Sequence, residues 1–213
     1  MPTRISRLGT DEQHTQLARY LAEHSDLAVV DLMPTLLRAK KNDRVFHKTD
    51  THWNDVGAYA GYEAILAAVR EALPEYADHL KPTRVIRREF SGKGIGLTSM
   101  VGLSAAYPEA MIELEKATPQ ARSLMADQRQ YARFEREQKP LALGVPGATL
   151  PRAVVFRDSF SNALIPYLSE NFRRVLWVWT RDVGGKPIER EQPDIVIQEI
   201  AGRLLDRTPL PIR

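Results

Sequence analysis

The stretch Lys48-Thr49-Asp50-Thr51-His52-Trp53-Asn54 sets a carboxylate, an imidazole and an indole directly before a long amphipathic segment. Apolar or aromatic side chains recur every three or four residues of that segment, which predicts a helix with one buried face. These side chains are Val56, Tyr59, Tyr62, Leu66, Val69 and Leu73. Asn54 is the expected N-cap of the helix. Asp50 and His52 therefore lie on the turn that enters it, where an aspartate can hold an imidazole in one tautomer as a general base.

A candidate nucleophile stands much later in the chain, where the apolar run 152–156 stops at Arg157-Asp158-Ser159 and a helical pattern begins. A serine at a strand-to-helix turn is exposed at the carboxyl edge of a sheet. The first amides of the following helix are expected to point at an oxyanion formed beside Ser159. Ser159 is therefore the residue that the pair Asp50 and His52 would activate.

Strands and helices alternate in the last third of the chain. The pattern predicts strands at 152–156, 175–179 and 193–197, a helix at 160–171 and a loop at Gly184-Gly185. Such alternation indicates a mainly parallel sheet within a three-layer α/β sandwich.

Ligands of parallel sheets bind at the carboxyl ends of the strands, next to Ser159 in this topology. Arg181 and Gln198 follow two of the predicted strands and are candidates for the oxyanion or substrate side by position alone. Arg157 and Trp53 are further candidates for substrate binding. Trp53 is equally suited to be an anchor of the core.

The N-terminal part has one capped helix and one apolar run. Thr10 and Gln13 form a capping box that predicts a helix ending near His24. The run Leu27-Ala28-Val29-Val30-Asp31 is predicted to be a short buried strand, and a brief helix is expected at 36–40 after Pro34.

The whole chain, residues 1–213, is predicted to be one domain with a poorly readable insertion or subdomain at 83–150. Residues 83–90 are typical of a polar edge or subdomain strand, and residues 96–103 of a small helix lying over the cleft. The segment 105–150 is expected to be inserted or edge-paired. The glycines Gly92, Gly94 and Gly96 resemble a phosphate loop, but no apolar strand precedes them and no Walker-type lysine follows, so a nucleotide site is not expected.

Other interpretations of the candidate residues remain open. Asp50 and His52 are compatible with a helix cap and a surface imidazole, and Ser159 is favoured at helix starts. His47, Asp50 and His52 are compatible with a metal site, but no third cluster with ligand spacing follows, so neither a metal nor a cofactor is expected. Neither motif taken alone favours covalent acyl transfer over these interpretations.

Composition excludes several classes of protein. The chain has a net charge of +3, which is too small for the basic surface typical of nucleic-acid binding. It has no cysteines, and therefore no disulfides or thiolate metal sites. It has no apolar run long enough to span a membrane, and its first residues lack the apolar core of a signal peptide. Two basic clusters are consistent with a solvated surface or with contact to an acidic polysaccharide: Arg84, Arg87, Arg88 and Lys93, and Arg173 with Arg174.

The segments Thr49-Asp50-Thr51-His52-Trp53-Asn54 and Phe156-Arg157-Asp158-Ser159-Phe160-Ser161 together resemble the SGNH-hydrolase-like domain of alginate O-acetyltransferases of the AlgJ and AlgX type. The resemblance covers about residues 27–205. It implies a permuted order, because the Asp-His pair precedes the serine whereas ordinary SGNH esterases place it last. Arg157 stands where those esterases have the glycine of Gly-Asp-Ser, and one residue separates Asp50 from His52 where they have two.

The resemblance also implies that the chain lacks an N-terminal part of the family's domain. A sheet whose first strand is 27–31 would then have an open edge, which needs a partner subunit or a shielding segment from residues 1–10.

The activity implied by the resemblance is O-acetyl transfer to, or removal from, a polysaccharide hydroxyl, with Ser159, His52 and Asp50 as the triad. The implied partners are a polysaccharide, an acetyl donor and the proteins of an exopolysaccharide acetylation system, such as that of alginate biosynthesis. The implied location is the periplasm. With water as acceptor the enzyme would be an acetylesterase, and a non-catalytic carbohydrate-binding module on the same scaffold is the alternative from another class.

Overall fold

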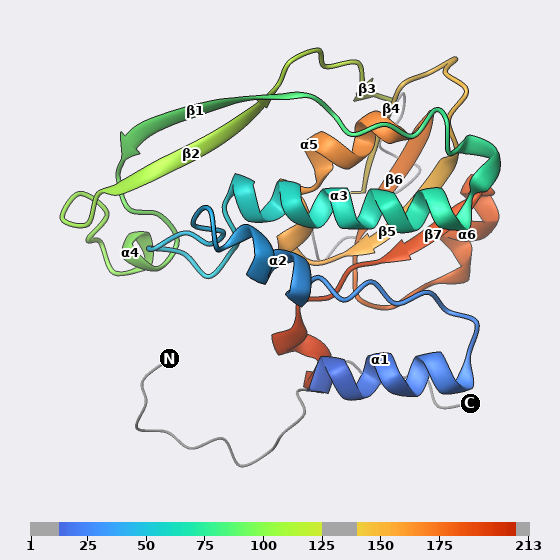
Figure 1. The fold of residues 1–213 in the computed structure, drawn as a ribbon, viewed down its shortest axis with the longest axis horizontal. Helices are drawn as coiled ribbons and strands as arrows, with labels where there is room; N and C mark the ends of the chain where they lie inside the picture. Colours follow the sequence, from blue (N-terminus) through green and yellow to red (C-terminus); the bar gives the residue numbers. More distant parts are fainter. Residues whose placement is uncertain (1–12, 125–139, 208–213) are drawn as a thin grey trace.

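A computed structural model describes residues 13–124 and 140–207 of the chain (Figure 1). A five-stranded sheet with the order β3-β4-β6-β5-β7 forms its centre. The strands are β3 (Arg122–Ser123), β4 (Leu141–Gly144), β5 (Arg152–Arg157), β6 (Arg174–Trp179) and β7 (Ile195–Gln198). β5 is parallel to β6 and β7, whereas the β3–β4 and β4–β6 pairs are antiparallel. The sheet is therefore mixed rather than mainly parallel, because β4, from the poorly readable segment, runs opposite to both of its neighbours.

Helices cover both faces of this sheet. Alternate residues of a strand point to opposite faces, and β5 and β6 are apolar at every position except Arg152, Arg157 and Arg174. Val155 and Trp177 pack on the side of α3 (Asp55–Ala72) and α5 (Ile165–Leu168). Val154 and Leu176 belong to a second cluster that contacts Ile188 of α6 (Gly185–Glu191). The molecule is therefore an α/β fold with three layers.

Helix α3 confirms the prediction made from its apolar spacing. Asn54 is its N-cap, and the Asn54 side chain accepts a hydrogen bond of 3.1 Å from the Gly57 amide. The buried face holds Tyr62, Leu66 and Val69 as expected. It also holds Gly57 and Gly61, and the lack of a side chain there lets the helix approach Val45 and Trp53 closely.

Residues 85–116 form an arm that extends from the body (Figure 1). Its strands β1 (Val85–Gly92) and β2 (Glu109–Lys116) pair antiparallel, and α4 (Leu97–Met100) lies in the connection at the far end. The base of the arm is tied to α3, because the Leu114 amide donates to the Asp55 carboxylate at 2.9 Å. The strand predicted at 83–90 corresponds to β1, and the small helix predicted at 96–103 corresponds to α4.

Two sequence predictions in the N-terminal part have different outcomes. Helices α1 (Gln13–His24) and α2 (Met33–Ala39) lie close to the predicted positions, although the Thr10 cap falls outside the described residues. The strand predicted at 27–31 is wrong. That run is an irregular connection on the surface in which Leu27 is 66% exposed, because both edges of the sheet are formed by other segments. The run 27–31 therefore forms no edge of the described sheet, whose edge strands are β3 and β7. The segment 1–10, expected to shield such an edge, lies outside the described residues.

The helix predicted at 160–171 is broken into three parts. A 3₁₀ segment (Ser159–Ala163) precedes α5, and another (Ser169–Asn171) follows it. Pro166 in the first turn of α5 has no amide hydrogen to continue the preceding turn, which separates the two helical parts. The loop predicted at Gly184-Gly185 is instead the start of α6. In the described ranges, 13–124 and 140–207, no helix is long and apolar enough to cross a bilayer.

Candidate active site

His52 bridges the two sequence motifs through its two ring nitrogens. Its Nδ1 lies 2.6 Å from Asp50 Oδ1, and its Nε2 lies 2.7 Å from Ser159 Oγ. The same Asp50 oxygen accepts a hydrogen bond of 2.9 Å from the His52 amide. The structure therefore brings together the three residues predicted to meet, although His52 and Ser159 are 107 positions apart in the chain.

The charge of Asp50 determines the tautomer of the imidazole. Partial burial raises the pKa of Asp50, but the hydrogen bonds and the charge from His52 outweigh that effect, and the pKa lies below its ordinary value. An ionised carboxylate only accepts hydrogen bonds, so Nδ1 of His52 carries the proton. In the neutral ring Nε2 is then the acceptor of the Ser159 hydroxyl hydrogen. A serine proton can pass to an imidazole arranged in this way.

Aromatic contacts lock the two motifs together beside the histidine. The Trp53 indole nitrogen donates to the Phe160 carbonyl at 3.0 Å, and the two rings meet edge to face at 5.5 Å. The Phe160 ring is tilted over the His52 ring with centroids 4.8 Å apart. Trp53 is only 5% exposed, which makes it the core anchor of the turn and leaves no open face for a sugar.

The serine side of the site is built on two acidic residues. Asp158 accepts hydrogen bonds of 2.8 Å from the amides of Phe160 and Ala201. Glu199, directly after β7, accepts from the Asp158 amide at 3.1 Å and from the Ser161 hydroxyl at 2.9 Å. The Phe160 amide therefore serves Asp158 and does not face an oxyanion, contrary to the expectation from the strand-to-helix turn.

Glu199 stands beside Gln198 at the carboxyl end of the last predicted strand, but only Gln198 was selected there as a candidate site residue. Burial of Glu199, followed by the negative charge of Asp158, raises the pKa of Glu199 to about 7. The Glu199 carboxyl also hydrogen-bonds to the Asp158 carboxyl, which favours the protonated form of Glu199. The turn that carries Ser159 therefore rests on a buried glutamate that holds its proton to a higher pH than an exposed glutamate does.

The other predicted binding residues have different surroundings. Arg157 is 5% exposed, stacks over the Trp179 ring at 4.4 Å and donates to Asn162 Oδ1 at 2.6 Å. Burial lowers the pKa of its guanidinium. Arg157 therefore braces the strand end behind Ser159 rather than opening toward a substrate.

Arg181 and Gln198 lie together at the ends of β6 and β7, where the Gln198 side chain donates to the Arg181 carbonyl at 2.6 Å. Within residues 13–124 and 140–207, the hydrogen bonds of these two side chains do not link them to Ser159.

The metal and polysaccharide alternatives can be compared with the same geometry. Both nitrogens of His52 are already engaged, and the described part of the chain holds no group of three or more side chains suited to a metal ion.

In the basic clusters, Arg87 pairs with Asp43 and Glu89, while Arg88 pairs with Glu115. These pairs favour a solvated ionic surface over a free basic patch.

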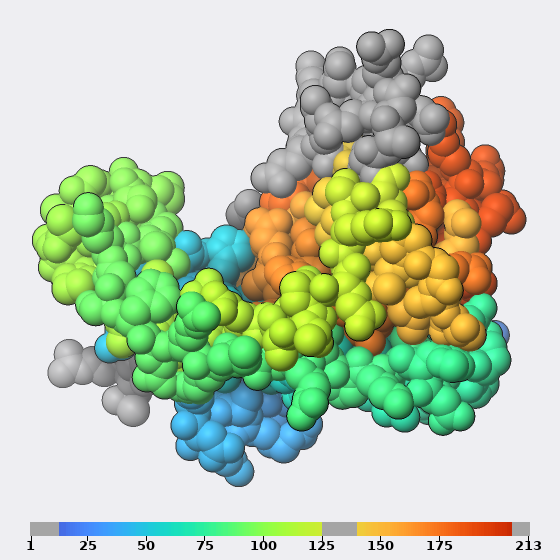
Figure 2. Space-filling view, turned by 90° about the horizontal axis from the view of Figure 1, so that it is seen from above, coloured from blue at the N-terminus to red at the C-terminus, as the bar shows by residue number. Residues whose placement is uncertain are grey.

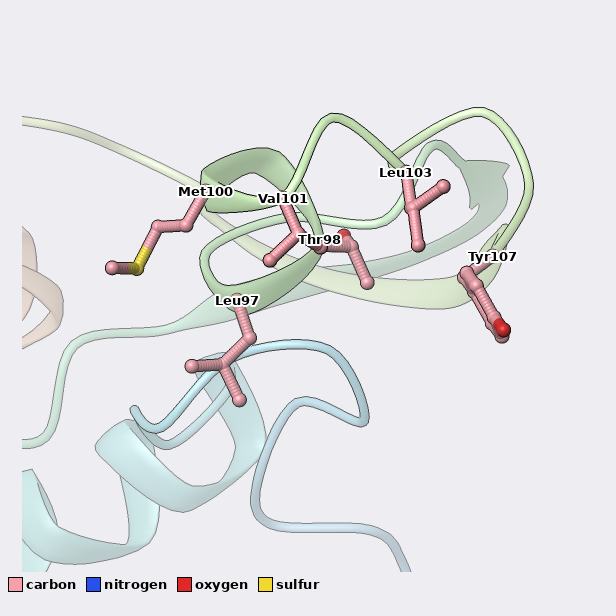
Figure 3. Close-up of a pocket in the computed structure, with 6 residues that line it drawn as sticks. All are labelled: Leu97, Thr98, Met100, Val101, Leu103 and Tyr107. Atoms are coloured by element: carbon pink, nitrogen blue, oxygen red, sulfur yellow. The ribbon is translucent and has the colours of Figure 1, made fainter.

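The site lies between the arm and the body. Figure 2 shows a notch between the green arm and the orange part of the body, with the cyan segment that leads into α3 at its floor. Gly96, directly before α4, presses against Asp50, and a Cβ atom at Gly96 would lie 2.0 Å from the Asp50 carboxylate. The arm also carries an open apolar cavity of about 440 Å³ (Figure 3), lined by Leu97, Thr98, Met100, Val101, Leu103 and Tyr107.

Solved structures with a related fold include three that bear on this arrangement. A DHHW family protein from Eubacterium siraeum DSM 15702 is 15% identical, with 90% of this chain and 70% of that chain covered and a TM-score of 0.64. Bacillus cereus PatB1 with a sulfonyl adduct is 16% identical, with 90% and 74% covered and a TM-score of 0.62. The O-acetyltransferase domain of Pseudomonas putida AlgJ is 20% identical, with 93% and 67% covered and a TM-score of 0.54. At these identities the likeness shows a shared fold.

Sequence comparison identifies the family. No curated protein matches the chain at a significant level. The profile of the SGNH hydrolase-like domain of the acetyltransferase AlgX matches residues 3–145, which is more than half of the sequence. The match contains Asp50 and His52 and ends before Ser159, so the structure is what joins the serine to the matched segment. The chain belongs to the family of SGNH hydrolase-like domains of the AlgX acetyltransferase type.

Proposed function

We propose that this chain is a polysaccharide O-acetyltransferase that works through an acetyl group held on Ser159. The observation that carries the proposal is the single imidazole of His52 hydrogen-bonded to Asp50 on one side and to Ser159 on the other. Family membership supports O-acetyl transfer in general. The permuted order of the triad, with Asp50 and His52 before Ser159, is part of the proposal.

The reaction has two balanced steps. His52 Nε2 takes the hydroxyl proton of Ser159 while Oγ attacks the acetyl carbonyl of the donor, and His52 returns that proton to the departing donor oxygen. His52 then takes the proton of the acceptor hydroxyl, which attacks the acetyl-serine and releases Ser159 with its proton restored. Asp50 stays ionised throughout and stabilises the imidazolium that forms in each step.

The acceptor decides between transfer and hydrolysis. A sugar hydroxyl bound in the notch would give transfer, whereas water at the same position would give an acetylesterase. A carbohydrate-binding module without activity is the alternative from another class, and the intact hydrogen-bonded chain at His52 favours an enzyme over it. An exopolysaccharide such as alginate, partner proteins that supply the acetyl donor, and a periplasmic location belong to this proposal through the family.

The decisive test is removal of the proposed nucleophile. Ser159→Ala is expected to lower the turnover of 4-nitrophenyl acetate by at least about 10³-fold, because one hydroxyl carries the covalent step. The midpoint of thermal unfolding should stay close to that of the wild type, since the change removes a single oxygen atom from a partly buried side chain. Ser123→Ala, at an exposed serine of β3, is the matched control and should retain full turnover. Undiminished turnover by folded Ser159→Ala would assign the chemistry to another residue.

A second measurement separates the three activities. The wild-type protein is incubated with an acetyl-ester donor and candidate polysaccharides, and both free acetate and polymer-bound acetyl groups are quantified. Acetyl groups on the polymer identify a transferase, and acetate alone identifies an esterase. Retention of polysaccharide without release of acetate, together with no labelling of Ser159 by a sulfonyl fluoride, would identify a binding module.

A further inference from the structure

Glu109 begins strand β2 of the arm, and its side chain reaches the residues directly before Asp50. Its Oε1 accepts the Lys48 amide at 2.7 Å. Its Oε2 accepts the Thr49 amide at 3.1 Å and the Thr49 hydroxyl at 2.6 Å. The side chain has no exposed surface. One buried carboxylate therefore binds three donors of two consecutive residues, although about sixty positions separate it from them in the chain.

This carboxylate is held in its ionised form. Burial raises the pKa of Glu109, but the hydrogen bonds from Thr49 and Lys48 and the charge of Arg44 outweigh burial, and the pKa lies below its ordinary value. Arg44 lies 3.1 Å from Glu109 Oε1. Burying a charged carboxylate costs desolvation free energy. The cationic partner and the three donors offset that cost only when all of them stay within hydrogen-bonding distance.

The arm also binds the other polar atoms of Thr49. The Thr49 hydroxyl oxygen accepts a hydrogen bond of 2.9 Å from the Ile95 amide. The Thr49 carbonyl oxygen accepts one of 2.9 Å from the Leu97 amide. The other end of the turn, at Asn54, is bonded to a nearby residue rather than to the arm, because the Asn54 amide donates to the Val45 carbonyl at 3.1 Å. The arm, through Glu109 and Thr49, is therefore what fixes the entry to Asp50.

We propose that Glu109 is a positioning residue of the active site, which sets the backbone of Lys48 and Thr49 so that Asp50 and His52 meet Ser159 in line. This inference rests on the proposed function. Glu109 touches none of the reacting atoms and acts only through the turn. Catalysis depends steeply on such placement, because a displacement of about 1 Å can cost about 10²-fold in rate.

The test compares two glutamates that hold backbone amides in the same way. Glu109→Gln keeps the shape of the side chain but has a single acceptor oxygen. The donors of Lys48 and Thr49, which bind two oxygens in the wild type, would have to share it. Glu170→Gln is the matched control, because Glu170 accepts the amides of Gln120 and Ala121 at 2.9 and 3.0 Å and pairs with Lys116 at the opposite end of β2. For 4-nitrophenyl acetate, Glu109→Gln is expected to lower kcat by about 10- to 100-fold with KM changed less than about twofold. Glu170→Gln should leave both unchanged.

A spectroscopic measurement reports the geometry without using turnover. The proton on His52 Nδ1 lies in a short hydrogen bond to Asp50 and is expected to give a downfield NMR signal. Glu109→Gln is expected to shift or abolish this signal, and Glu170→Gln to preserve it. An unchanged signal together with an unchanged kcat in Glu109→Gln would overturn the proposal. Equal losses of kcat in both variants would also overturn it, because they would show general destabilisation.

A milder pair of variants covers the case in which Glu109→Gln does not fold. Thr49→Val removes the hydroxyl that binds Glu109, whereas Thr49→Ser keeps it. The proposal predicts a loss of kcat in Thr49→Val and its recovery in Thr49→Ser, and equal kcat in the two folded variants would contradict it. The proposed function fails separately, when Ser159→Ala is as active as the wild type, and the NMR signal still tests Glu109 in that case.

Discussion

At the scale of single residues, the site is held by carboxylates that accept backbone amides. Asp50 binds the amide of His52, Asp158 those of Phe160 and Ala201, and Glu199 that of Asp158. The bond from the His52 amide to the ionised Asp50 is stronger than a bond between neutral groups, and Glu199 accepts its amide with a carboxyl group that burial keeps protonated to a higher pH. Each acidic side chain therefore fixes the backbone next to a reacting group, and Asp50 does so while it also orients the imidazole.

The prediction at this scale concerns the tautomer of His52. In Asp50→Asn the new amide can offer its NH2 group to Nδ1, which would move the imidazole proton to Nε2, facing Ser159. We expect kcat for an acetyl ester to fall by roughly 10³- to 10⁴-fold, because the imidazole can no longer accept the serine proton. Steady-state kinetics check this. Asp43→Asn is the control. Asp43 lies on the same connection between α2 and α3 as Asp50 but pairs with Arg87 of β1, so this variant should keep its activity.

The sequence predicted the three residues that meet at the candidate site, but not most of the residues that support them. Asp50, His52 and Ser159 were found because each stands at a recognisable turn beside a capped helix or an apolar strand. Glu109 begins strand β2 and Glu199 directly follows strand β7, and the neighbours of both strands are decided by tertiary packing. An acceptor of backbone amides leaves no local pattern. The position of Glu199 at a strand end was the one signal that could have identified it.

At the scale of elements, helix α3 and the turn before it form one unit. The isolated bridge between Phe46 and Trp53 closes the turn, and the Asn54 side chain donates to the Arg44 carbonyl at 2.7 Å. Gly57 lets the first turn of α3 press against the Val45 carbonyl. The helix therefore sets where the turn begins and ends, and the turn sets where His52 lies.

Gly57→Ala tests this contact. A Cβ atom at position 57 would lie 2.2 Å from the Val45 carbonyl oxygen, which belongs to the backbone and cannot rotate away. We expect a loss of about 1–3 kcal/mol in the free energy of unfolding, measured in urea. Gly185→Ala is the matched control, because the nearest atom there is the end of the Glu189 side chain at 3.6 Å. A Gly57→Ala protein as stable as the wild type would show that the Val45 carbonyl can move aside without a loss in the free energy of unfolding.

Elements with strong local signals were predicted best. The spacing of apolar residues and the Asn54 cap identified α3, and the apolar runs identified β5, β6 and β7. The run 27–31 is as apolar as a strand, yet strand formation needs a neighbour, and the sheet offers it none. β3 and β4 were missed because short strands that complete a sheet are selected by pairing and carry little pattern of their own.

At the scale of the whole molecule, the arm and the body each contribute one side of the site. The body carries Ser159 at the end of β5 and Glu199 after β7, while the arm holds the turn through Glu109. Figure 2 shows these two parts on either side of the notch. The direction of the arm and the mixed order of the sheet are consequences of contacts between distant segments, so local sequence patterns could not predict them.

The buried pair of Glu199 and Asp158 makes the stability of this assembly depend on pH. In the folded protein the pKa of Glu199 is raised to about 7, and in the unfolded chain it returns to about 4.3. The folded state therefore binds the proton more tightly. The contribution of this group is full below about pH 4.3 and is lost as the pH rises through about 7.

Glu199→Gln is expected to remove that dependence. The amide oxygen can still accept from the Asp158 amide and the Ser161 hydroxyl, and the NH2 group can donate to the Asp158 carboxylate as the protonated acid does. In urea unfolding at pH 4.5 to 7.5, the stability of Glu199→Gln relative to the wild type should rise with pH, by an amount of the order of 3 kcal/mol. Asp158→Asn, which keeps an acceptor for the Phe160 amide but removes the opposing charge, should make the dependence on pH shallower. A difference between Glu199→Gln and wild type that stays constant across this range would mean that Glu199 ionises at its ordinary pKa, in spite of its burial beside Asp158.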